Sequence, residues 1–214
     1  IREIFSTFGY TRHRVFIEFA YFIELLRFLK LTKINDEVIL LWSKVLLSVP
    51  NSKLMIKHKN LQNEIIAKNI IQKFEKENVN RKRLIFLGET KTRKESLETY
   101  NKIDIALDPF PFQGNTSTCE SIWMGVPVLT LYGNRYLFHF GESINCNLDM
   151  KDWISKNKEE YVSKAIKFSS KIEDLSRIRK TLRAKALSSP VFNAPRFAEH
   201  FDYMLWKIWK DFIG

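Results

Sequence analysis

The chain has 214 residues, of which 45% are hydrophobic and 14% aromatic, so it can form a large core and is not intrinsically disordered. Its net charge of +11 would suit a polyanionic partner. However, many lysines lie beside glutamates, as on solvated helix faces, and no basic-aromatic motif of a nucleic-acid-binding module accompanies them. We therefore expect no specific nucleic-acid partner and keep a basic nucleic-acid-binding or membrane-surface protein only as an alternative.

Cysteine and histidine usage argues against a metal site. Cys119 and Cys146 lack metal-ligand spacing, and the four histidines are scattered, so we expect no bound metal. With only two cysteines and no recognisable leader, we expect a cytoplasmic protein with reduced thiols. The most apolar segment, residues 15–31, contains four charged residues, whereas a membrane span needs about 20 nearly uncharged ones. Because the chain begins with Ile1, we expect a fragment or a processed product.

The pattern along the chain predicts an α/β protein. Residues 1–30 have neither a clean helical nor a clean strand period, and we expect them to form a separate, helical segment. From residue 31 to residue 150, short apolar runs alternate with amphipathic stretches. The expected strands cover residues 52–58, 83–89, 103–108 and 126–133, and the expected helices cover residues 35–49, 60–79, 93–103 and 118–125. Such alternation is typical of right-handed βαβ units, so we expect a Rossmann-like parallel sheet over residues 31–150.

Beyond Lys151 the pattern predicts helices only. They cover residues 158–172, 173–187 and 195–212, and we expect residues 151–214 to pack on the same domain. The last of these helices carries Trp206 and Trp209. We expect it to fold back over the sheet or onto a neighbouring domain.

A polar loop, "QGNTST", lies between an expected strand and an expected helix. In an open α/β sheet, ligands bind beyond the carboxyl ends of the strands, which is where this loop begins. The free N–H groups and the positive end of the helix dipole would attract a phosphate there. Thr116, Ser117 and Thr118 add hydroxyl groups, and Gly114 lets the backbone come close. An ordinary helix N-cap would explain the same pattern, and Glu120 is either a ribose ligand or a surface glutamate.

The segment "DIALDPFPFQGNTSTCESIWMGVPVLTLYGNR" resembles the C-terminal part of the O-linked N-acetylglucosamine transferase and SPINDLY family. Further blocks match in order, and the resemblance covers residues 28–212. These blocks are "LTKINDEVILLWSKVLLSVPNSKL", "RLIFLGETKTRKESLETYNKIDIALD", "GESINCNL" and "LRAKALSSPVFNAPRFAEHF". The resemblance implies the Rossmann-like C-terminal half of a two-domain GT-B glycosyltransferase, with extra C-terminal helices.

The resemblance also implies the residues that would hold the donor diphosphate. Lys33 would contact the diphosphate and steady the leaving group, which suits a lysine because the departing diphosphate gains negative charge. Gly114 and Asn115 belong to the loop. The hydroxyl groups of Thr116 and Ser117 would lie on the phosphates. No metal and no cofactor are implied, and the donor would be UDP-N-acetylglucosamine or GDP-fucose.

Three further residues would lie along the nucleoside. Glu120 matches an acidic residue that binds the ribose, and Arg93 and Ser96 fall in the segment that lies against the base and ribose. The chain departs from the family at three places. Asn115 stands where O-linked N-acetylglucosamine transferases carry a histidine, although the SPINDLY-like branch also lacks it. "FL" replaces Phe-Asn ahead of Lys33, and "RYLFHFGES" replaces a run of small residues that includes an arginine.

The expected function is the donor-binding part of a glycosyltransferase. It would move an N-acetylglucosamine-like or fucose-like sugar from a nucleotide diphosphate to serine or threonine hydroxyls of an acceptor protein. The expected partners include a missing N-terminal catalytic half and tetratricopeptide repeats, without which the chain would bind the donor but transfer no sugar. The alternative is an inactive nucleotide-binding module or a drifted copy of the enzyme.

Overall fold

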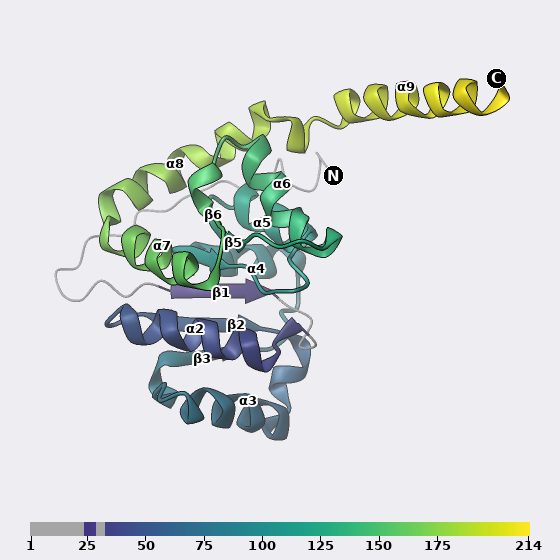
Figure 1. Ribbon diagram of the computed structural model, residues 1–214. Coiled ribbons are helices and arrows are strands. Elements are labelled where there is room, and N and C mark those ends of the chain that lie inside the picture. Colours follow the sequence, from purple (N-terminus) through teal and green to yellow (C-terminus); the bar gives the residue numbers. More distant parts are fainter. Residues whose placement is uncertain (1–23, 29–32) are drawn as a thin grey trace.

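Six parallel strands form one sheet at the centre of the molecule (Figure 1). The computed structural model describes residues 24–28 and 33–214, with side chains from residue 33 onward. The strands are β1 (Glu24–Phe28), β2 (Lys53–Lys57), β3 (Leu84–Leu87), β4 (Ile105–Leu107), β5 (Val128–Leu131) and β6 (Ile154–Ser155). Their order is β3-β2-β1-β4-β5-β6, and each neighbouring pair is parallel. The order reverses between β1 and β4, and ligands of such sheets bind at this switch point.

Helices connect and cover the strands. They are α2 (Asp36–Ser48), α3 (Glu64–Lys76), α4 (Arg93–Glu98), α5 (Thr116–Trp123), α6 (His139–Asn147), α7 (Lys158–Ser170), α8 (Ile172–Ser188) and α9 (Ala194–Ile213). Short 3-10 helices also occur, at Lys59–Gln62, Arg81–Arg83, Thr99–Lys102, Tyr136–Phe138, Lys151–Trp153 and Pro190–Phe192. Right-handed crossovers put α2 and α3 on one face of the sheet and α4 and α5 on the other. Helix α7 lies beside α2, and α8 lies beside α5.

Asparagine side chains define where several helices begin. Each accepts a hydrogen bond from a backbone N–H group of the first turn, which otherwise has no intrahelical partner. The helices capped in this way are α2, α3, α7 and α9, by Asn35, Asn63, Asn157 and Asn193. The apolar faces of the helices then pack on the sheet. Trp42 of α2 and Ile122 of α5 are completely buried in one core with Ile56 and Leu107 of the strands.

The predicted fold class is confirmed, and the strands and helices predicted between residues 35 and 133 are present. The expectation of a helical segment over residues 1–30 is wrong for residues 24–28, which form β1 between β2 and β4. The segment ELLRF lacks the apolar–polar alternation that identifies a half-buried strand, and the pattern therefore did not predict β1. Residues 1–23 lie outside the described part. The expectation of helices only after Lys151 is also wrong, because β6 extends the sheet there.

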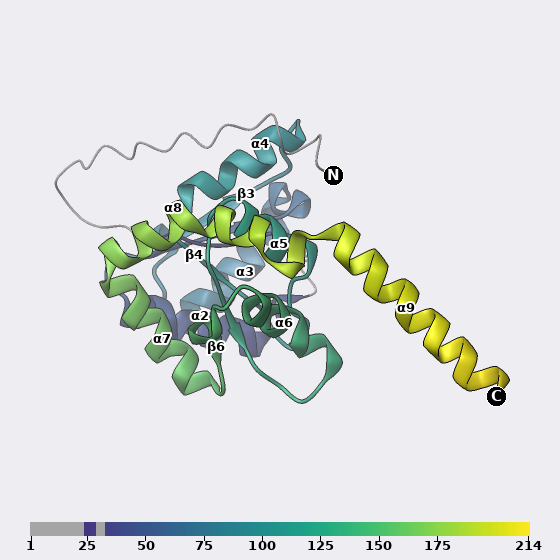
Figure 2. The same ribbon diagram turned by 90° about the horizontal axis from the view of Figure 1, so that it is seen from above.

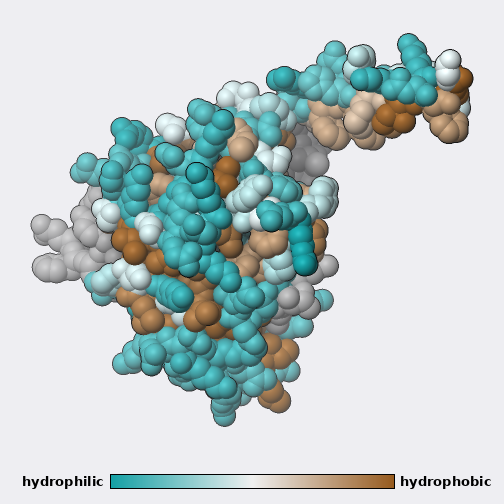
Figure 3. All heavy atoms as spheres, in the orientation of Figure 1, coloured by the Kyte–Doolittle hydropathy of each residue, from teal (hydrophilic) through white to brown (hydrophobic). Residues whose placement is uncertain are grey.

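Helix α9 projects away from the sheet as a single rod (Figures 1 and 2). None of its residues is buried. Its large apolar side chains gather on one side of the helix (Figure 3) and are exposed; they include Phe197, Phe201, Met204, Leu205, Ile208, Trp209 and Phe212. The expectation that this helix folds back over the sheet is therefore wrong. Packing onto a neighbouring domain remains a prediction.

His58 makes stability depend on pH. Its Nδ1 atom accepts a hydrogen bond from the Asn60 N–H group at 3.1 Å and caps the 3-10 helix that follows. Burial, and then the charge of Lys59, lower the pKa of His58 below its ordinary 6.5. Below pH 6.5 the unfolded chain therefore binds a proton at this position more readily than the folded protein, and the free energy of unfolding falls as pH falls.

We expect urea denaturation at pH 7, 6 and 5 to show this loss. In the His58→Asn variant, whose side chain retains an acceptor and does not titrate, the dependence on pH should be shallower. An unchanged slope in the variant would show that protonation of His58 does not control this part of the pH profile.

Candidate functional site

Two loops meet at the switch point of the sheet. One precedes α2 and carries Lys33, and the other follows β4 and leads into α5. The Nζ atom of Lys33 donates a hydrogen bond to the backbone oxygen of Gln113 at 2.9 Å and lies 3.7 Å from the centroid of the Phe112 ring. The side-chain amide of Asn35 donates to the backbone oxygen of Phe110, also at 2.9 Å. These contacts hold the lysine predicted to bind the diphosphate against the loop predicted to bind it.

A buried carboxylate shapes this loop from beneath. Asp108, at the end of β4, has no exposed surface. It accepts hydrogen bonds from the Gly114 N–H group at 2.8 Å and from the Thr130 hydroxyl at 2.9 Å. A Cβ atom added to Gly141 would lie 2.5 Å from the Asp108 carboxylate and 2.4 Å from the Thr130 hydroxyl, so glycine is required for this close approach.

Gln113 is the second buried support of the loop. Its side-chain amide donates to the backbone oxygen of Leu131 at 2.6 Å, and its side-chain oxygen accepts from the Gly141 N–H group at 2.7 Å. The side chain thus joins the loop to the end of β5 and to α6. Together, Asp108 and Gln113 fix the backbone at the start of α5 before any ligand binds. Such preorganisation is what an electrostatic binding site needs.

Helix α5 begins at Thr116 and points its N-terminus at the same edge. The Asn115 side chain makes no capping bond, and the first N–H groups of a helix lack intrahelical partners. Thr116 is exposed and Ser117 is half-buried, so both are accessible to a ligand. Thr118 is different. It is completely buried and its hydroxyl donates to the Gly114 backbone oxygen at 3.0 Å, so it supports the loop instead of facing a ligand.

The structure brings Glu120 and Arg93 together one turn further along α5. A guanidinium nitrogen of Arg93 lies 2.5 Å from one carboxylate oxygen of Glu120. The Tyr100 hydroxyl donates to the other oxygen at 3.1 Å, and it lies 3.4 Å from the backbone oxygen of Ser117. The Glu120 side chain is only 12% exposed. Its orientation is therefore fixed by two partners from the α4 region.

Lys57, the last residue of β2, completes this side of the site. It is buried and donates to the hydroxyls of Thr90 and Ser96, both at 3.0 Å. Burial lowers the pKa of Lys57, and the nearby Glu120 acts in the opposite direction. Ser96 therefore lies in a cationic environment at the carboxyl edge of the sheet. Sequence reasoning missed Lys57, because a lysine at the end of a short alternating strand normally faces solvent.

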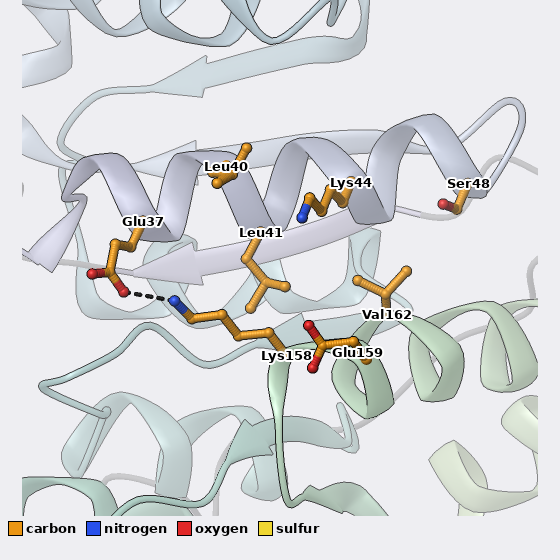
Figure 4. A pocket seen from close by; sticks show the side chains of 8 residues that line it. All are labelled: Glu37, Leu40, Leu41, Lys44, Ser48, Lys158, Glu159 and Val162. Atoms are coloured by element: carbon orange, nitrogen blue, oxygen red, sulfur yellow. Dashed lines mark hydrogen bonds and ion pairs between the residues drawn. The ribbon is translucent and has the colours of Figure 1, made fainter.

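Two cavities lie away from this site, and the predicted site residues line neither of them. A cavity of about 300 Å³ lies between α2 and α7 (Figure 4), and another of about 370 Å³ lies against α8. In the first, Leu40, Leu41 and Val162 are apolar, and Glu37 pairs with Lys158 at 2.7 Å.

Within residues 24–28 and 33–214, no group of His, Cys, Asp and Glu side chains is arranged to hold a metal ion. The helices of the described part include none with the length and apolarity needed to cross a membrane.

Comparison with known proteins decides the family. The sequence model described as "Glycosyl transferase family 41" matches residues 21–201. The chain belongs to this family. The resemblance noted in the sequence is thereby confirmed, and the site described above is the edge of a family 41 domain.

The curated relatives of this family 41 domain are much longer proteins. A probable UDP-N-acetylglucosamine–peptide N-acetylglucosaminyltransferase SPINDLY from Arabidopsis thaliana is 32% identical over 185 residues, which are 86% of this chain and 20% of the relative. A UDP-N-acetylglucosamine–peptide N-acetylglucosaminyltransferase from Caenorhabditis elegans is 23% identical over 86% of this chain and 16% of the relative. The chain thus spans about a fifth of the length of these relatives.

Solved structures support the fold. A mutant of the Thermobaculum terrenum O-GlcNAc transferase matches with a TM-score of 0.84 and 31% identity, over 89% of this chain and 36% of that one. HepE of Anabaena, solved with UDP and glucose, matches with a TM-score of 0.58 and 11% identity, over 86% of this chain and 48% of that one, and it shares the fold alone. The family 41 domain is therefore the predicted Rossmann-like part of a GT-B glycosyltransferase.

Proposed function

We propose that this family 41 domain binds UDP-N-acetylglucosamine and presents the sugar for transfer to serine or threonine hydroxyls of proteins. The observation that carries the proposal is the contact of Lys33 with the loop that opens α5. It puts a cation, a helix N-terminus and the hydroxyl groups of Thr116 and Ser117 at one edge of the sheet. The names of the curated relatives support this donor. GDP-fucose has no comparable support.

The chemistry of the proposed reaction is a displacement at the anomeric carbon. The bond between the sugar and the β-phosphate oxygen breaks, a bond to the acceptor oxygen forms, and the acceptor hydroxyl loses its proton. The leaving UDP gains negative charge as this happens. Lys33 and the N-terminus of α5 would stabilise that charge where it develops, and the enzyme needs no covalent nucleophile.

The nucleoside would lie on the side of Arg93, Ser96 and Glu120. In the proposal, the Glu120 carboxylate accepts a hydrogen bond from a ribose hydroxyl. Arg93 and Tyr100 hold that carboxylate in position. Gly114 and Asn115 form the turn over which the diphosphate passes.

We further propose that the chain binds the donor but does not transfer the sugar by itself. An acceptor hydroxyl must be held about 3 Å from the anomeric carbon, and that placement contributes several kcal/mol to the rate. In a GT-B enzyme a second domain closes the reaction cleft, and the relatives contain about five times as much chain. The partners would be that remaining part and an acceptor protein. The two cysteines are both free thiols, which suits the cytoplasm.

Calorimetric titration tests the proposal. UDP and UDP-N-acetylglucosamine should bind, and uridine, which lacks the diphosphate, should bind far more weakly. At 100 times its dissociation constant, UDP should raise the free energy of unfolding by about 2.7 kcal/mol. The mass of a serine-rich acceptor peptide should stay unchanged. Absence of UDP binding would reject the donor-site proposal, and turnover by the isolated chain would reject the need for a second domain.

A further inference from the structure

Exposed aromatic side chains lie next to the loop that leads into α5. Beyond β5, Tyr132 is 41% exposed and Tyr136 is 75% exposed, and Phe112 of the neighbouring loop is 42% exposed. We call Phe112, Tyr132 and Tyr136 the aromatic platform. The mechanism proposed above assigns no ligand contact to these rings, although the Phe112 ring also contacts Lys33. Figure 2 shows the segment between β5 and α6 as a loop that projects from the body of the domain.

This segment is anchored to the candidate site. The Gln113 N–H group donates to the backbone oxygen of Leu137 at 3.3 Å. The ring of Phe138 packs so closely on Gly133 that an added Cβ atom there would lie 2.5 Å from it. Tyr136 in turn contacts the Phe140 ring edge to face, with 5.2 Å between the ring centroids. These contacts hold the backbone of the segment in place, and the rings of the platform are exposed.

The order of the strands along the sheet edge indicates which part of the donor would lie near the aromatic platform. The cluster of Arg93, Glu120 and Lys57 includes the end of β2, on one side of β1. The loop after β4 lies on the other side of β1, and β5 comes next. Neighbouring strands are about 4.8 Å apart. A donor whose nucleoside lies at the first cluster and whose diphosphate lies at the β4 loop would therefore extend its third part, the sugar, towards the end of β5.

We propose that the aromatic platform binds the pyranose ring of the nucleotide-sugar donor. The C–H face of a pyranose is apolar and flat, and it fits against an aromatic ring while its hydroxyls bond to polar neighbours. Here the hydroxyls of Tyr132 and Tyr136 and the exposed guanidinium of Arg135 supply such neighbours. Sugar sites commonly combine aromatic rings with a few polar groups in this way. The inference rests on the proposed function, because it assumes that the diphosphate lies at the β4 loop.

The test compares UDP with UDP-N-acetylglucosamine on the purified chain. The wild type should bind the nucleotide sugar more tightly than Tyr136→Ala does, by about 5- to 10-fold, which corresponds to about 1 to 1.4 kcal/mol. The affinity for UDP should change less than 2-fold, roughly 0.4 kcal/mol. The matched control is Tyr203→Ala, since Tyr203 is 72% exposed but lies on α9. It should change neither affinity.

A second measurement reports on the contact itself. In proton NMR, the sugar C–H resonances of the bound donor should shift upfield through the ring current of a tyrosine, and Tyr136→Leu should abolish the shift. Loss of affinity for the sugar alone, together with loss of this shift, supports the platform. If UDP binds but Tyr136→Ala weakens both ligands equally or neither, the platform is wrong and the proposed function stands. If UDP does not bind the wild type, both are wrong.

Discussion

Replacing Lys33 with methionine is expected to weaken UDP binding by about 10- to 100-fold. A hydrogen bond to a charged group contributes about 1.5 to 3 kcal/mol, which corresponds to this range. Methionine is close to lysine in length and still contacts an aromatic ring favourably, so the packing on Phe112 should survive. The variant therefore removes the charge and leaves the shape of the loop. Calorimetric titration of UDP into wild type and variant measures the difference.

The matched control for this experiment is Lys68→Met. Lys68 is an exposed lysine on α3, so its replacement removes the same net charge away from the site. It should reduce UDP affinity only slightly, and the reduction should vanish as salt screens the general field of the protein. Equal weakening by the two variants would mean that Lys33 acts through net charge and has no direct contact with the diphosphate.

Asp108→Ala is expected to reduce the free energy of unfolding by about 3 kcal/mol. The change leaves the Gly114 N–H group and the buried Thr130 hydroxyl without their acceptor. Each buried polar group left unsatisfied costs about 1 to 3 kcal/mol. The loop at the start of α5 should lose its fixed shape as well. Urea denaturation measures the stability, and UDP titration below the transition measures the effect on the site.

Two variants separate the role of the buried carboxylate from a general effect of losing an aspartate. Asp108→Asn keeps an oxygen for the Gly114 N–H group, and the Thr130 hydroxyl can rotate to accept from the new amide. It should retain most of the stability. Asp152→Ala, at an exposed position, should be nearly neutral. A small loss in Asp108→Ala, comparable with that in Asp152→Ala, would show that the loop does not depend on these bonds.

The sequence predicted those helices and strands in which the spacing of apolar residues follows the period of the element. Helix α2 begins at an Asn cap and carries apolar residues at helical spacing, and it forms as predicted. Strand β1 was missed because its sequence, ELLRF, does not alternate between apolar and charged residues, so periodicity did not identify a strand there. Strand β6 has only two residues, Ile154 and Ser155, and so few residues carry no period.

The residues of the candidate site could be predicted from the sequence where they lie close together in one loop. Gly114, Thr116 and Ser117 stand out because glycine and hydroxyl residues precede a helix. Gln113 does not, because its two bonds reach Leu131 and Gly141, 18 and 28 residues away. Nothing in the local sequence marks a glutamine for such a role. Only the fold brings its partners within reach.

Because α9 projects from the domain, the tryptophans of the chain fall into a buried group and an exposed group, and their fluorescence can be followed separately. Trp42, Trp123 and Trp153 are at most 8% exposed, whereas Trp206 and Trp209 on α9 are 58% and 52% exposed. Helix α9 has no buried residue among its 20, so it lacks the tertiary packing from which most helical stability in proteins comes. We therefore expect α9 to lose its helical structure before the sheet unfolds. The emission of the buried tryptophans follows global unfolding, while that of the exposed pair follows whatever covers α9.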